Sequence, residues 1–313
     1  KSLIDYVKSV TDDAETFLKN WAVIPLRWIA ASDLNDFQFF VKNSDQAFIS
    51  LDSLKFKKNT IYKFVPSFSL IQTLLKSSKN PDEFFLMIIS TYGFFNVSNS
   101  GNNDLDENQQ QLILLLTFYF ILCLIFDTNC IERNYSSIHR LIVISSLMVN
   151  DLTIDEIEAL WHKQTCFDSE FMDDLHSFAS KITTKKESKF HLTNSSEWHP
   201  LLPFMQMSSI IPLVQIFIHN NPDSLINFPE LPNDSIHLLF SPTLWALEFF
   251  ILSHKCSKDY QIIQQFVFNT LIITSQYCDQ FYHDNKNEND EDDSILIITD
   301  FVDLATKLKK LTF

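Results

Sequence analysis

Apolar residues recur at steps of three and four positions along most of the chain, and this spacing is typical of amphipathic helices. The segment 109–127 differs because it is apolar on almost every side, which indicates a helix buried all round. The fold class is therefore expected to be mainly α. The expected helices span residues 3–21, 25–41, 68–75, 84–92, 109–127, 242–252, 258–282 and 297–311.

The stretch 136–193 carries a different order of elements: three helical patterns, then a short hairpin. The third pattern has the cleanest apolar face, with Phe171, Met172, Leu175, Phe178, Ala179 and Ile182. After it, Lys185, Lys186 and Lys189 are expected in a polar turn, and Phe190 and Leu192 alternate with His191 as in a half-buried strand. Three helices and a small β-hairpin make a winged-helix module, so we predict a helical scaffold with a central winged helix.

Two helix starts can be assigned to particular residues. Thr153 and Glu156 have the spacing of a capping box, in which each side chain bonds the other residue's backbone N–H. Asn80-Pro81-Asp82-Glu83 combines a cap residue, a proline in the first turn and an acid three residues after the cap. We expect the chain to consist of an N-terminal helical region (1–133), a winged-helix-like domain (134–200) and a C-terminal helical region (201–313) with an acidic linker near 284–293.

Composition narrows the possible functions. The 313 residues have a net charge of −15, which argues against nucleic acid or an anionic membrane as partner. The third helix of the module carries Asp168, Glu170, Asp173 and Asp174, where a DNA reader needs lysine or arginine. Only two glycines occur, so glycine-rich nucleotide loops are excluded. Leu112–Phe126 is shorter than the roughly 20 residues of a bilayer helix and is expected to be a core helix.

No group of residues predicts an active site. The five cysteines form no C-x-x-C pair, and His162 with Cys166 lacks an orienting third group. His176 follows Asp173 at helical spacing, as in a surface hydrogen bond, and His191, Trp198 and His199 border the hairpin, where packing is the simplest role. The acidic run Asp290–Asp293 lacks the ligand spacing of a calcium loop. We therefore predict no catalytic, cofactor-binding or metal-binding residue in this chain.

Several short landmarks follow one another along the chain. They are Pro25-Leu26-Arg27, Phe68 to Thr73, Asp82 to Ile89, Ile138-His139-Arg140-Leu141, Phe190-His191-Leu192, Trp198 and Pro203-Phe204. Their order resembles the central region of the UBR-type E3 ubiquitin-protein ligases, the N-recognins. The resemblance covers roughly residues 20–275, and two differences, a hairpin without glycine and Asn150–Thr153 in place of a Pro-x-x-His-Ser-like turn, indicate a divergent member.

This resemblance implies a non-catalytic scaffold inside a RING ligase that acts in N-degron-dependent ubiquitination and proteasomal degradation. The zinc of such a ligase is expected in the parent's UBR box and RING, not in this segment, and the same domains would contact N-degron substrates and a ubiquitin-conjugating enzyme. Lys1 stands where an initiator methionine would, so a piece of a longer protein is expected. The implied location is cytoplasmic, with a nuclear one as the alternative. The alternative hypothesis for the function is a free-standing helical and winged-helix adaptor that binds another protein.

Overall fold

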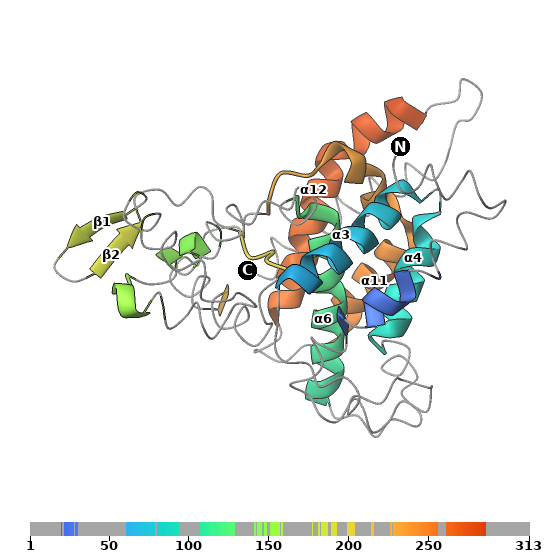
Figure 1. Cartoon of the computed structure of the whole chain (residues 1–313). Helices are drawn as coiled ribbons and strands as arrows, with labels where there is room; N and C mark the ends of the chain where they lie inside the picture. Colours follow the sequence, from blue (N-terminus) through green and yellow to red (C-terminus); the bar gives the residue numbers. More distant parts are fainter. Residues whose placement is uncertain are drawn as a thin grey trace, which may run out of the picture.

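The structure, a computed structural model, is mostly helical in the residues that it describes (Figure 1). These residues are 20, 22–27, 29–30, 61–78, 80–93, 107–128, 141, 143–145, 147–148, 151–156, 158, 177, 181, 183–186, 189–192, 199–203, 214–215, 226, 228–255 and 261–285. The mainly α fold class is confirmed. The expected helices over 3–19, 31–41 and 297–311 lie outside the described residues, as does the acidic run 286–293.

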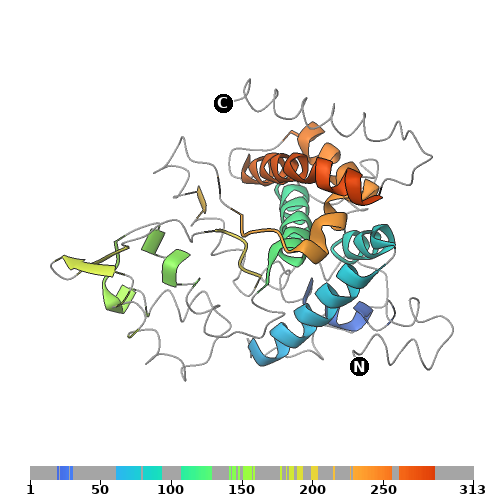
Figure 2. The same cartoon turned by 90° about the horizontal axis from the view of Figure 1, so that it is seen from above.

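Helix α6 (Glu107–Phe126) is the centre of the helical body. Every residue from Gln111 to Asp127 is buried, because the segment has no polar face to turn toward water. Helices α3 (Ile61–Ser77), α4 (Pro81–Thr91) and α12 (Gln261–Asn285) all contact it. Figure 2 shows α3 and α12 on opposite sides of α6. The expectation of a core helix over Leu112–Phe126 is therefore confirmed.

Helix α3 is longer than the sequence pattern predicts. It begins at Ile61 and contains Pro66, although only residues 68–75 carry the clear apolar spacing. Proline lacks the N–H of a regular helical bond and normally marks a helix boundary, so the pattern predicts a start after it. The predicted apolar face itself is confirmed at Phe68, Ile71 and Leu75, which are fully buried.

Helices α4 and α11 (Pro242–Ser253) both begin with a proline in the first turn, as predicted. The buried face of α4 consists of Phe84, Phe85, Ile88 and Ile89, which matches its apolar spacing. Asn80 occupies the N-cap position of α4, but its side chain makes no cap bond and instead donates to Glu83 Oε1 at 3.0 Å. Both starts are thus confirmed, whereas the expected capping contact of Asn80 is wrong.

A 3₁₀ helix, η2 (Asn233–Phe240), precedes α11 and was not predicted. It is short, and its apolar residues pack in the core, where η2 contacts α3, α6, α11 and α12. Within the described part of the chain, no single helix combines the length and apolarity needed to cross a bilayer; only the pair η2 and α11, bent by 62°, passes on those two criteria together. Leu238, Leu239, Leu244 and Leu247 of that pair are buried inside the protein.

A two-stranded antiparallel sheet lies at one end of the molecule, away from the large helices (Figures 1 and 2). Strand β1 (Thr183–Lys186) pairs with β2 (Lys189–Leu192), with Lys185 opposite Phe190 and Lys186 opposite Lys189. The hairpin is therefore confirmed. Lys185, Lys186 and Lys189 belong to the strands rather than to the turn, because the strands extend further toward each other than the apolar alternation predicts.

Helical turns precede this sheet. Leu141, Val143 to Ser145, Leu147 and Met148 are helical; Val143 to Ser145 and Leu147 are buried, and Leu141 and Met148 pack partly buried against the core. Leu141 and Met148 belong to the apolar face expected from Ile138, Leu141, Ile142, Met148 and Val149, whose other members lie outside the described residues. A second turn begins at Ile154. The expected third helix, with its four carboxylates from Asp168 to Asp174, lies outside the described residues apart from Ser177 and Lys181, which are helical.

The buried apolar residues form one cluster that draws on all three predicted regions. Leu26 and Phe68 come from the first, Val143 and Leu152 from the second, and Leu201 and Phe266 from the third. The boundaries at about 133 and 200 stay predictions.

Candidate functional site

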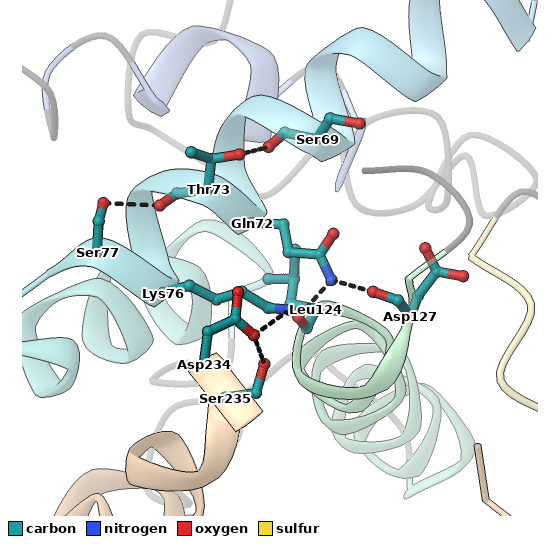
Figure 3. A network of polar contacts seen from close by, with 9 residues as sticks. All are labelled: Ser69, Gln72, Thr73, Lys76, Ser77, Leu124, Asp127, Asp234 and Ser235. Atoms are coloured by element: carbon teal, nitrogen blue, oxygen red, sulfur yellow. Dashed lines mark hydrogen bonds and ion pairs between the residues drawn. The ribbon is translucent and has the colours of Figure 1, made fainter. Parts of the chain in front are cut away.

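The side chain of Gln72 forms the most buried polar contact between two helices (Figure 3). Its Nε2 donates to the carbonyl oxygens of Leu124 at 2.7 Å and Asp127 at 2.6 Å, at the end of α6. The last carbonyls of a helix lack partners within the helix, so this amide satisfies two of them. Both partners are acceptors, which fixes the amide orientation with the NH₂ toward α6. The cost is a buried Oε1 without a hydrogen bond.

One turn further along α3, Lys76 forms an ion pair with a residue of η2. Its Nζ lies 3.0 Å from Asp234 Oδ1, and the lysine side chain is only 6% exposed, whereas the aspartate is 62% exposed. Asp234 Oδ1 also accepts from the hydroxyl of Ser235 (Figure 3). Because one partner faces water, the pair contributes only about 0–1 kcal/mol, so its main effect is to set the position of η2.

Asp82 connects the first turns of α4 and α11. Its Oδ1 accepts from the hydroxyl of Ser241 and from the backbone N–H of Thr243 at 2.9 Å. Ser241 is the N-cap of α11 and accepts in turn from the N–H of Leu244. Burial raises the pKa of Asp82, but the hydrogen bonds from Ser241 and Thr243 outweigh it, so the pKa lies below its ordinary value. The carboxylate thus serves α11 as an additional cap supplied by another helix.

Tyr119 anchors the segment 199–203 to α6. Its hydroxyl donates to the carbonyl of Pro200 at 2.8 Å and accepts from the N–H of Leu202 at 2.9 Å. His199 beside it is buried, and its Nδ1 has no hydrogen-bond partner. Burial lowers the pKa of His199 to about 4, so the imidazole is neutral near pH 7. This segment lies directly after the hairpin region and is fixed to the central helix by one phenol.

In the part of the chain that the structure describes, a β-bridge joins the hairpin to the segment before the second helical turn. Leu152 and Phe190 exchange two backbone hydrogen bonds, at 2.8 and 3.3 Å. Next to the bridge, His191 Nδ1 lies 2.8 Å from Asp151 Oδ1, so this histidine has a polar role in addition to the predicted packing. The bridge attaches the sheet to the loop before the second helical turn.

The predicted capping box is present at that second turn. Thr153 N–H donates to Glu156 Oε2 at 2.8 Å, and Glu156 N–H donates to Thr153 Oγ1 at 3.2 Å. The hydrogen bonds from the backbone and hydroxyl of Thr153 lower the pKa of Glu156, with a smaller contribution from Lys189 of β2. This prediction from residue spacing is confirmed atom by atom.

Glu248 is a buried acidic residue that the sequence analysis did not single out. It lies on the buried face of α11, is 1% exposed, and neither carboxyl oxygen has a hydrogen-bond partner. Burial raises its pKa well above the ordinary value. The spacing from Leu244 and Leu247 to Ile251 places it on an apolar face, which was the signal that could have identified it.

Most of the residues considered as chemical candidates cannot be placed, because they fall in the undescribed parts of the chain. His162, Cys166, Asp173, His176, Trp198 and Asp290 to Asp293 lie outside the described residues, and His191 and His199 have the separate surroundings given above. Within the described ranges, no three His, Cys, Asp or Glu side chains gather as metal ligands. The described side chains of Gln72, Lys76 and Asp82 bond separate helices to one another.

No protein-family model matches the chain, and no curated protein or solved structure matches it either.

Proposed function

We propose that the chain is a non-catalytic scaffold segment of a UBR-type RING ubiquitin ligase in the N-degron pathway. The observation that carries the proposal is the order of sequence landmarks from Pro25 to Phe204. In this role the segment holds a substrate-reading end and an enzyme-recruiting end at a fixed separation. Zinc, substrate and the ubiquitin-conjugating enzyme would be bound by other domains of the parent protein.

The described landmarks support a framework role because they lie where helices meet. Leu26 is fully buried, Gln72 bonds the end of α6, and Asp82 caps α11. A segment that transmits position between two domains needs helices joined at defined points, and hydrogen bonds to backbone groups give such points.

The second part of the proposal is that residues 134–200 form a winged helix that contacts protein. The order of helical turns before the sheet and the bridge between Leu152 and Phe190 support it, since a winged helix joins its hairpin to a short strand ahead of the second helix. The net charge of −15 favours a protein over DNA. Slow amide exchange at both Leu152 and Phe190, measured by NMR, is the expected result; fast exchange at both contradicts a bridged sheet.

The ligase proposal is tested in cells of the source organism. Deletion of the gene is expected to lengthen the half-life of a reporter with N-terminal arginine, while the same reporter with N-terminal methionine serves as the matched control. Full-length protein restores rapid turnover. An unchanged half-life of the arginine reporter contradicts the proposal, as does a parent sequence without a UBR box and a RING.

A free-standing adaptor is the second candidate. Ile24, Leu86 and Phe249 are 70%, 44% and 61% exposed, and exposed apolar side chains are typical of protein contacts. A pull-down with the chain alone separates the two readings. An adaptor recovers a defined partner that is lost with Phe249→Ser, whereas a scaffold segment alone recovers none.

A further inference from the structure

Glu248 is a buried carboxyl group on the apolar face of α11. Helix α11 buries Leu244, Leu247 and Ile251 on the same face, and Glu248 lies among them with both oxygens unbonded. The described elements that pack most extensively against α11 are α4, α12 and η2. The acid is therefore part of the surface that attaches α11 to the rest of the body.

The ionisable groups of these neighbouring elements are engaged elsewhere or make no bond to Glu248. On α4, Asp82 bonds Ser241 and Thr243, and Glu83 bonds Asn80. On η2, Asp234 pairs with Lys76 and His237 lies one turn later. The described side chains of α12 add Tyr277 and Cys278, and His254 at the end of α11 stacks on Phe250. Burial is the sole cause that shifts the pKa of Glu248, so no described cation compensates its charge.

An ionised carboxylate at this position would be cut off from bulk solvent and would find no counter-charge among the described residues. Transfer of an unpaired charge into an apolar interior is so unfavourable that the group remains neutral or the structure opens. We propose that the packing of α11 against α4 and α12 is a proton-controlled joint, closed while Glu248 is protonated and loosened when its carboxyl ionises. This inference concerns the helical body and does not depend on the proposed ligase role.

The sign of the pH dependence follows from the protonation states. With α11 open, Glu248 ionises around its ordinary value of 4.5, whereas with α11 closed it keeps its proton to a higher pH. Between these two values, each unit of rising pH favours the open form by up to about tenfold. The effect is opposite to that of Asp82, whose lowered pKa makes the closed form lose stability only as the pH falls.

The joint is tested by hydrogen exchange of the full chain between about pH 5.5 and pH 7.5, with mass spectrometry of peptides from α11 and α6. The ratio of the two exchange rates cancels the intrinsic effect of pH on exchange. In the wild type this ratio is expected to rise by about tenfold or more over the interval. In Glu248→Gln and in Glu248→Leu it stays constant, because neither side chain ionises.

The matched control is Glu230→Gln, an exposed acid just before η2. It is expected to behave as the wild type. If Glu248→Gln does not fold, the exchange ratio of Glu248→Leu tests the proposal, since an apolar side chain suits a buried position on the apolar face of α11. A wild-type ratio that does not change with pH, or the same pH-dependent rise in wild type and variants, overturns the proposal.

Discussion

The carboxylate of Asp82 accepts a hydrogen bond from the backbone N–H of Thr243 at 2.9 Å, so the first turn of α4 caps the first turn of α11. We expect Asp82→Ala to lower the free energy of unfolding by about 1–2 kcal/mol, the usual cost of a lost helix cap. Urea unfolding followed by circular dichroism measures it. Glu83→Ala on the same turn is the control and is expected to cost less; equal losses would indicate a general effect on α4.

We also expect the contribution of Asp82 to the stability of the fold to depend on pH in the acid range. Although burial raises the pKa of Asp82, the hydrogen bonds from Ser241 and Thr243 lower it below the ordinary 3.8. Its stabilising contribution is therefore complete above the unfolded value and disappears as the pH falls through the lower folded value. Unfolding curves recorded from neutral pH downward are expected to converge for wild type and Asp82→Asn at the acid end. A difference that stays constant with pH contradicts the assignment.

Among the polar side chains of the helical body, we expect substitution of Gln72 to lower the free energy of unfolding most. Gln72→Leu leaves the carbonyls of Leu124 and Asp127 without this donor, and we expect a loss of about 2–4 kcal/mol, reduced somewhat because the unbonded Oε1 is removed as well. Gln72→Glu places a carboxylate against two carbonyl oxygens and is expected to be worse at neutral than at acid pH.

The control for this site is Thr73→Ala on the exposed side of α3, where the hydroxyl bonds only to Ser69 of the same helix. A change within about 0.5 kcal/mol is expected there. Similar midpoints for the Gln72 and Thr73 variants in denaturant unfolding would mean that the contact with α6 contributes little.

Removal of the Tyr119 hydroxyl is expected to destabilise the segment 199–203 locally. Tyr119→Phe keeps the ring beside Phe266, at a centroid distance of 6.1 Å, but removes the partner of Pro200 and Leu202. A loss of about 1–3 kcal/mol is expected, together with faster exchange of the Leu202 amide. Tyr277→Phe, on the half-buried margin of α12, should leave that amide unchanged. Unaltered exchange in Tyr119→Phe would place the attachment of this segment elsewhere.

The amino-acid pattern alone was sufficient to predict most of the large helices that the structure describes and where several of them begin. The capping box of Thr153 and Glu156 and the proline starts of α4 and α11 involve residues within one turn of each other, so residue spacing is sufficient. The central position of α6 could also be predicted, because a helix without a polar face must be covered on all sides. Local periodicity did not reveal the first turns of α3, where a proline interrupts the usual signal, or the short helix η2.

Only the tertiary structure decided which helices the polar residues join. The bonds of Gln72 to Leu124 and of Asp82 to Thr243 connect positions 52 and 161 residues apart, and a helical repeat of three to four residues carries no information over such distances. The surroundings of Glu248 are decided in the same way. Its position on an apolar face can be predicted from sequence, but whether a cation meets it there depends on the helices that pack against α11.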